Sequence, residues 1–462
     1  MAVTPTLARL APLLPRQDEP PSDGPTWQQL SLSITGVLVG AGLLGLPYAL
    51  RQAGWAGLLI IAATTMATCQ TAKMLVWAFT ALERDGIVVS TYEDLVGALA
   101  GPRSCAAMRF AMLFECYGAM ICFVVLHAHS WPVVLNLPSS VMGLDSRYLV
   151  IILVLAAAFP CALLQPRHLS VFGPLGLLAT AVLFGAAIAT PFISDVSAEC
   201  PNLDDSRPSS SQSPTITHQA LNPAGIGMAI GIILFCFSGH ATFPDLYHQL
   251  PAKERPNFDQ AADRGFAIAG VLYAIFASVG YRAYGSCAAD AITLNLMQQS
   301  PVLGHIAAVA VLISTFTIIP IQFFVVIRIL EDSNPLLRAP ESKTYGAPNV
   351  TDERGFCNHT TFTPSCSQLL VPIAPLNFAV RLCLFLFAGF IAVAIPNFHV
   401  VVALIGAFTT MIISFIVPPI LHMRVCFKVG DSFPKHTALF YLLLVCMGFV
   451  GMFVGVRNAL EG

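Results

Sequence analysis

The chain has 462 residues, of which 56% are hydrophobic and only 10% are charged, and its mean hydropathy is +0.74. Soluble proteins carry roughly 25% charged residues, so this chain has too little polar surface to cover a water-soluble body of its length. The composition therefore predicts a polytopic membrane protein. The net charge of −2 gives no basic surface for a nucleic-acid partner.

Residues 1–28 are expected to form a disordered cytosolic tail, because they are rich in proline and their apolar runs are too short for a signal-peptide core. The thirteen cysteines form no CxxC pair and no Cys/His spacing of a metal site, so we expect neither a metal nor a cofactor. Most cysteines lie inside apolar runs, where they are expected to act as small hydrophobic residues.

Eleven apolar runs are long enough to cross about 30 Å of hydrocarbon, which takes roughly 20 residues. They cover 29–50, 56–80, 106–130, 147–164, 172–194, 221–246, 264–285, 302–330, 372–394, 399–422 and 436–457. With the N-terminus in the cytosol, 18 of the 23 Lys and Arg residues fall on the cytosolic side and 5 on the other side. The positive-inside rule therefore favours a cytosolic N-terminus and a C-terminus on the opposite side.

The spans divide into two halves. Residues 29–194 are expected to form one unit of five helices, and residues 221–422 a second, inverted unit, with 436–457 as an appended eleventh helix. The loop 195–220 is expected on the non-cytosolic side and the loop 331–371 in the cytosol. The first loop contains Cys200, for which a disulfide with Cys287 is one alternative and two free thiols the other.

Two spans contain helix-breaking residues at matched positions. The first reads "VGAGLLGLPYAL" over 39–50, and the sixth reads "FSGHATFP" over 237–244. Glycine and proline weaken a helix by about 1 and 3 kcal/mol relative to alanine. Irregular backbone at membrane depth persists only where it is buried in protein or lines a cavity. Interrupted helices five spans apart indicate an inverted repeat of five helices, as in secondary transporters, rather than close packing through small residues alone.

These motifs resemble those of the amino acid/auxin permease family. "GVLVGAGLLGLPYALRQAGWAGL" (36–58) is similar to that family's first span and "GIILFCFSGHATFPDLYHQL" (231–250) to its sixth. "LFECYGAMICFVVL" (113–126), "FPCALLQPRHLSVFG" (159–173) and "AYGSCAADAITLNL" (283–296) extend the resemblance. It is specific over 29–330, diffuse over 372–457, and closest to the vesicular and vacuolar branch. The resemblance implies a LeuT-like fold and amino acid transport driven by protons or, in some members, by sodium.

The two interruptions are predicted to form the substrate site. A break at 40–42 leaves a half-helix that begins near Leu43, and its free N–H groups favour a carboxylate. Carbonyl groups freed at Phe237 and Ser238 are expected to accept hydrogen bonds from an ammonium group. The candidate substrate-binding residues are Gly40, Ala41, Gly42, Leu43, Phe237, Ser238, Gly239 and His240. Together they would recognise the backbone of an α-amino acid.

Two titratable groups are the candidates for proton coupling. Glu115 is the one acid well inside a predicted span, and a buried charge there costs about 3 kcal/mol, which marks a functional group unless it only fastens helices together. His240 lies in the second interruption and is either a gating or proton-carrying group or a structural one. His127 and His129 are expected at the membrane interface.

The sequence bears on the identity of the driving ion, because two positions lack the side-chain oxygens that could bind sodium. The resemblance implies that sodium-coupled relatives carry an Asn where this chain has Gly36, and a hydroxyl residue where it has Ile318, two positions before Pro320. Neither residue offers a side-chain oxygen, which favours protons. The alternative sodium ligands are nearby hydroxyl groups, namely Thr35, Ser314, Thr315 and Thr317.

The sequence contains no HExxH, GxSxG or clustered Asp/His that would indicate an enzyme. The expected protein is a monomeric secondary transporter of neutral amino acids in the lipid bilayer of a vacuole or vesicle, with the plasma membrane as the alternative. A sodium-coupled transporter, or an amino-acid sensor on the same fold, is the alternative function.

Overall fold

The computed structural model describes residues 24–87, 89–141, 143–164, 172–193, 215–337, 375–395, 397–429 and 435–461, and these are almost entirely helical. In the first half of the chain the elements are α2 (Trp27–Leu38), η1 (Ala41–Gly45), α3 (Leu46–Ala53), α4 (Gly57–Arg84), α5 (Tyr92–Ala100), α6 (Pro102–Val134), β1 (Ser140–Val141), β2 (Leu144–Asp145), α7 (Ser146–Cys161) and α9 (Phe172–Ile193).

The described part of the second half is also mainly helical. Its elements are η2 (Pro223–Gly225), α10 (Ile226–Cys236), η3 (His240–Thr242), α11 (Phe243–His248), η4 (Arg255–Asn257), α12 (Phe258–Tyr284), η5 (Gly285–Cys287), α13 (Ile292–Gln299), α14 (Pro301–Ser333), η6 (Pro335–Leu337), α15 (Pro375–Ala394), α16 (Phe398–Ile405), η8 (Gly406–Ile416), α17 (Val417–Val429) and α18 (Lys435–Glu461). The segment η8 is a π-helix, and α16, η8 and α17 follow one another without a gap.

Within the described residues, eight helices are long and apolar enough to cross a membrane. A ninth span results if α2 is counted together with the helix that follows it, which is bent from it by 55°. Two further apolar helices, α7 and the 175–190 part of α9, are shorter than this criterion requires. Each of the predicted apolar ranges overlaps a helix, so the chain is an all-helical, multi-pass membrane protein.

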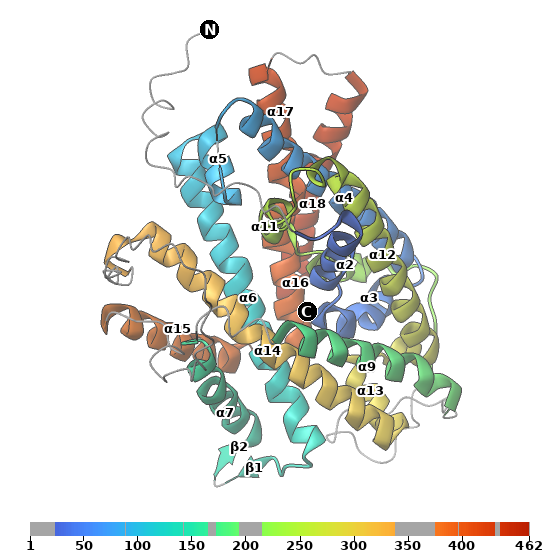
Figure 1. Ribbon diagram of the computed structural model, residues 1–462. Helices are drawn as coiled ribbons and strands as arrows, with labels where there is room; N and C mark the ends of the chain where they lie inside the picture. Colours follow the sequence, from blue (N-terminus) through green and yellow to red (C-terminus); the bar gives the residue numbers. More distant parts are fainter. Residues whose placement is uncertain are drawn as a thin grey trace, which may run out of the picture.

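The helices cross one another around α6. Figure 1 shows α6 running through the molecule with α14 crossing it, α7 and α15 on one side, and α2, α3 and α12 on the other. Contacts between α14 and both α6 and α9, and between α12 and α2, dominate the packing. This arrangement brings the first and sixth predicted spans into the interior.

Glycines allow some of the closest helix approaches. A Cβ atom on Gly406 would lie 1.9 Å from the carbonyl oxygen of Gly231, and one on Gly280 would lie 2.4 Å from Cγ of Pro47. Neither position has room for a side chain, so α10 packs directly on η8, and α12 on α3. Gly231 therefore does serve helix packing, as small residues do in membrane helices.

Several elements have no counterpart in the predicted spans. The nine-residue helix α5 begins at the N-cap Thr91, whose side chain accepts a hydrogen bond from the Asp94 N–H group, and α13 occupies the connection between α12 and α14. The strands β1 and β2 form an antiparallel hairpin that pairs Ser140 with Asp145. Hydropathy alone misses these elements because they are short.

Some predictions fall outside the described residues: most of the tail 1–28, residues 195–214 of the non-cytosolic loop, and 338–371 of the cytosolic loop. Cys287 is disulfide-bonded. Cys200, the partner considered from the sequence, lies outside the described residues, so the pairing stays a prediction.

Candidate functional site

The first interruption separates α2 from α3. The last α-helical hydrogen bond runs from Val39 N–H to the carbonyl of Thr35, and the next one runs from Leu43 N–H to the carbonyl of Gly40 at 3.2 Å. A 3₁₀ turn therefore begins at Ala41, two residues before the predicted start, and becomes α-helical at Leu46. The N–H groups of Ala41 and Gly42 precede the first hydrogen bond of this half-helix, which makes them donors for a ligand.

The second interruption separates α10 from η3 and α11. Helix α10 ends at Cys236, and residues 237–239 belong to no helix before η3 begins at His240. In the part of the chain that the structure describes, the carbonyl oxygens of Phe237 and Ser238 accept no hydrogen bond. They are acceptors within a buried segment, because Phe237 is fully buried and Ser238 only partly exposed.

The two interruptions touch each other. A Cβ atom on Gly42 would lie 2.8 Å from Sγ and 3.2 Å from Cα of Cys236, and one on Gly239 would lie 3.3 Å from Cδ2 of Leu38. The donors of the first half-helix and the free carbonyls of the sixth span therefore lie on adjoining segments. The structure thus brings together the two sets of candidate substrate-binding residues.

Tyr273 of α12 links the two helix ends. Its hydroxyl lies within hydrogen-bond distance of the carbonyl oxygen of Leu38, where α2 ends, and of the carbonyl oxygen of Cys236 at 2.7 Å, where α10 ends. These two carbonyls are thus engaged, whereas those of Phe237 and Ser238 are not. The acceptors available to a ligand therefore begin one residue after the end of α10.

Glu115 lies in the middle of α6 and points to the second interruption. Its Oε1 accepts a hydrogen bond from the Ser238 hydroxyl and another from the Thr410 hydroxyl of η8, at 3.3 Å. The carboxyl is buried, and no lysine, arginine or histidine among the described residues forms an ion pair with it. Among the described residues, Glu115 therefore has no ion-pair partner. Its two hydrogen bonds do connect α6 to the second interruption and to η8.

His240 is the first residue of η3, after the second interruption, and it bonds to α4. It is 1% exposed, and its Nε2 atom lies 2.9 Å from the hydroxyl oxygen of Thr71 on α4. Its Nδ1 atom is buried and has no hydrogen-bond partner among the described residues. A buried polar atom without a partner is costly, and a ligand or a water that forms a hydrogen bond with Nδ1 would satisfy it.

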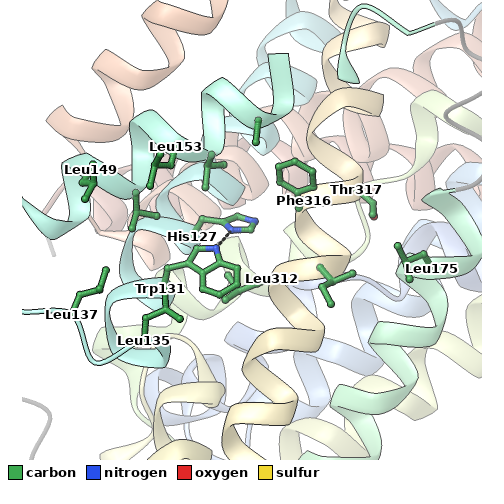
Figure 2. Close-up of a pocket in the computed structure, with 14 residues that line it drawn as sticks. His127, Trp131, Leu135, Leu137, Leu149, Leu153, Leu175, Leu312, Phe316 and Thr317 are labelled. Atoms are coloured by element: carbon green, nitrogen blue, oxygen red, sulfur yellow. Dashed lines mark hydrogen bonds between the residues drawn. The ribbon is translucent and has the colours of Figure 1, made fainter. Parts of the chain in front are cut away.

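His127 was expected at the membrane interface, and the structure shows that its side chain is buried among the helices and only 1% exposed. Its Nδ1 accepts a hydrogen bond from the Trp131 indole at 3.0 Å, and its Nε2 lies 3.1 Å from the Thr315 hydroxyl. Figure 2 shows His127 and Trp131 beside an apolar cavity of about 600 Å³ between α6, α7 and α14. An indole N–H only donates, so Nδ1 of His127 is the acceptor in this hydrogen bond. Both ring nitrogens of His127 therefore have hydrogen-bond partners within the protein.

The hydroxyl groups considered as alternative sodium ligands each form a hydrogen bond within the protein. Thr315 bonds to His127, Thr317 donates to the carbonyl of Ser314 at 2.7 Å, and Ser314 donates to the carbonyl of Gly176 at 3.3 Å. Thr35 of α2 lies within hydrogen-bond distance of the carbonyls of Ser31 and Gly265. No cluster of His, Cys, Asp and Glu among the described residues has the arrangement of a metal site.

Contacts between charged or polar side chains lie beyond both ends of the interrupted helices. Near α3, His399 lies 3.4 Å from Asp290, and its hydrogen bond and charge hold the pKa of that carboxyl below its ordinary value although burial opposes this. Beyond α11, Arg255 lies 3.4 Å from Glu83 of α4, which also accepts a hydrogen bond from the Tyr247 hydroxyl. Sequence reasoning did not identify these groups.

Other contacts of the site were also missed. Tyr273 bonds to the carbonyls of Leu38 and Cys236, where α2 and α10 end. Thr71 bonds to His240 and Thr410 to Glu115, each from a distant segment, and no local pattern in the sequence signals these pairings. The threonines at 409–410 and Ser414 mark polar positions inside an apolar run of the sequence.

Comparison with known proteins gives consistent matches. The family model described as "Transmembrane amino acid transporter protein" matches residues 23–461. The amino acid transporter AVT1B of Arabidopsis thaliana is 25% identical over 95% of this chain and 71% of its own length. The vesicular inhibitory amino acid transporter of Homo sapiens is 24% identical over 93% of this chain and 74% of its own length.

A solved structure supports the fold. It is a substrate-bound, outward-open Na⁺-coupled sialic acid symporter, with a TM-score of 0.50 at 12% identity, covering 95% of this chain and 90% of that one. At this identity the likeness concerns the fold alone. The family model also extends the resemblance beyond residue 330, where the motifs alone were diffuse.

Proposed function

Because the chain belongs to the transmembrane amino acid transporter family, we propose that it is a proton-coupled secondary transporter of α-amino acids that works by alternating access. Its relatives are named transporters, which agrees with the expectation that it is not an enzyme. In this proposal the chain crosses the membrane eleven times, with the N-terminus in the cytosol. Spans 1–5 and 6–10 form two inverted halves, and spans 1 and 6 are discontinuous.

The observation that carries the proposal is the contact between the two interruptions. The N–H groups that open the half-helix at Ala41 and Gly42 favour a carboxylate. The carbonyl oxygens of Phe237 and Ser238 favour an ammonium group. Since Gly42 packs directly on Cys236, both sets of groups reach one ligand whose carboxylate and ammonium are borne by the same carbon atom.

Proton coupling is assigned to Glu115, and a second role in the site to His240. The Ser238 hydroxyl bonds to the Glu115 carboxyl, so a change in the protonation of that carboxyl acts directly on a residue beside the ammonium acceptors. The unpartnered Nδ1 of His240 lies in the same interruption. Sodium is disfavoured because Gly36 and Ile318, at the positions where the family resemblance implies sodium ligands, carry no side-chain oxygen.

The substrate is proposed to be a neutral amino acid, because Glu115 is the one acid among the described residues that bonds to the interruptions, and the proton occupies it. The contacts at Asp290 and at Glu83 are proposed to be the two closures that open alternately.

A vesicular relative favours an endomembrane location, with the C-terminus in the lumen. A sensor would bind the same ligand without net transport.

The experiment that tests the function compares ligands in liposomes that contain the purified protein. Uptake of a labelled neutral amino acid is measured in competition with its amine analogue, which lacks the carboxylate, and its carboxylic acid analogue, which lacks the ammonium group. We expect only the intact α-amino acid to compete. Equal competition by either analogue would refute the two-ended site, and binding without net uptake would favour the sensor.

A further inference from the structure

Glu93 is a second buried carboxyl that the proposed site does not use. It lies in the first turn of α5, on the side of the molecule assigned to the cytosol, and its side chain is 5% exposed. Its Oε2 atom is buried and has no hydrogen-bond partner among the described residues. Such an atom calls for a water or a proton.

Helix α5 is attached to the segment that binds Glu115. The neighbouring residue, Tyr92, is buried and donates a hydrogen bond from its hydroxyl to the carbonyl oxygen of Ile413 in η8, at 2.8 Å. Thr410, in the same π-helix, donates to Glu115. Tyr92 also lies within electrostatic reach of the Glu115 carboxyl.

Ser414 lies between these two attachment points and the cytosolic end of the helix. It follows Thr410 by four residues, about one turn, and directly follows Ile413. Its hydroxyl oxygen is also buried and without a partner among the described residues. Cys116, next to Glu115 on α6, lies within electrostatic reach of both Glu115 and Glu93.

We propose that Glu93 is a second proton-carrying carboxyl on the cytosolic side of Glu115, and that Ser414 and Tyr92 border the path between them. The inference rests on the proposed proton coupling. One proton leaves the Glu115 carboxylic acid, passes through water bound at the Ser414 hydroxyl, and is taken up by the Glu93 carboxylate. No electrons move, and each carboxyl returns to its starting charge after the next transfer.

The surroundings of Glu93 suit this role. Burial raises the pKa of its carboxyl, and the nearby Asp94 adds to that, whereas its backbone hydrogen bond, Thr91 and Arg109 lower it. Arg109 of α6 lies 3.6 Å from Asp94, so its charge is shared with that neighbour. Arg424 of α17 contacts the far end of α5, at the carbonyl of Leu99.

The test replaces Glu93 by glutamine, which keeps the shape and removes the titration. In liposomes we expect uptake driven by a pH gradient to fall by about tenfold or more. Exchange of labelled for unlabelled amino acid at equal pH on both sides should continue. Asp263→Asn is the control, because it removes a largely exposed carboxyl that pairs with Lys73 on other helices, and it should behave as the wild type.

Glu115→Gln separates the two claims. If Glu93→Gln leaves the rate and its pH profile unchanged while Glu115→Gln abolishes coupling, the role of Glu93 is refuted and the proposed function stands. If Glu115→Gln also keeps full coupling, the proposed function itself fails. Should Glu93→Gln not fold, wild-type protein is treated with dicyclohexylcarbodiimide, which modifies buried protonated carboxyls. Labelling of Glu93 that rises as the pH is lowered is expected, and its absence at every pH would overturn the inference.

Discussion

Gly42→Val is expected to abolish substrate binding and uptake. The first added carbon would lie 2.8 Å from Sγ and 3.2 Å from Cα of Cys236, and the latter is backbone that cannot rotate away. The valine therefore pushes the two interruptions apart and separates the carboxylate donors from the ammonium acceptors. The measurement is binding of a labelled amino acid to purified protein, followed by uptake in liposomes.

Gly36→Val is the matched control, since it lies in the same span. A Cβ atom on Gly36 would meet no heavy atom within 4 Å, so this variant should fold and bind as the wild type does. Gly42→Ala, which adds only the first carbon, should weaken binding less than valine does. Wild-type affinity in Gly42→Val would show that the contact with Cys236 is not part of the site.

Glu115→Gln is expected to lower uptake driven by a pH gradient by about a hundredfold or more, because a group that transfers protons contributes at least that much. Glutamine still accepts a hydrogen bond from Ser238 or Thr410, so the protein should remain folded and keep binding the amino acid. Uptake should no longer depend on pH. The measurement is the initial rate of uptake over a series of imposed pH gradients.

Two further variants serve as comparisons for the effect of Glu115→Gln on uptake. Asp263→Asn changes a carboxyl that is largely exposed and pairs with Lys73, and it should retain pH-driven uptake. Thr410→Val removes one donor to Glu115 but keeps the acid, so uptake should slow while its pH dependence persists. An unchanged pH profile in Glu115→Gln would assign the carboxyl to holding α6, the second interruption at Ser238 and η8 together.

The sequence was most informative where composition and local chemistry decide the structure. Apolar length predicted where the helices lie, and the Gly and Pro residues at 40–47 and 239–244 pointed to the two segments in which the helical hydrogen bonding is interrupted. Such features are local, because they follow from the cost of glycine and proline in a helix. The family resemblance likewise rested on these motifs.

The missing parts depend on tertiary contacts. Tyr273 lies 235 residues from Leu38 in the chain, and Thr410 lies 295 residues from Glu115, so no local pattern indicates that they meet. The hydrogen bond between His127 and Thr315 was likewise not foreseen, because the two residues lie 188 positions apart in the chain. Glu93 went unnoticed because α5, with nine residues, is too short to register as a span.

The most direct test of the central claim is the identity of the driving ion. Purified protein in liposomes is given either a proton gradient without sodium or a sodium gradient at constant pH, and uptake of a neutral amino acid is followed. We expect accumulation with the proton gradient alone, and its collapse when a protonophore is added. Accumulation driven by sodium at constant pH, with no response to the proton gradient, would contradict the account.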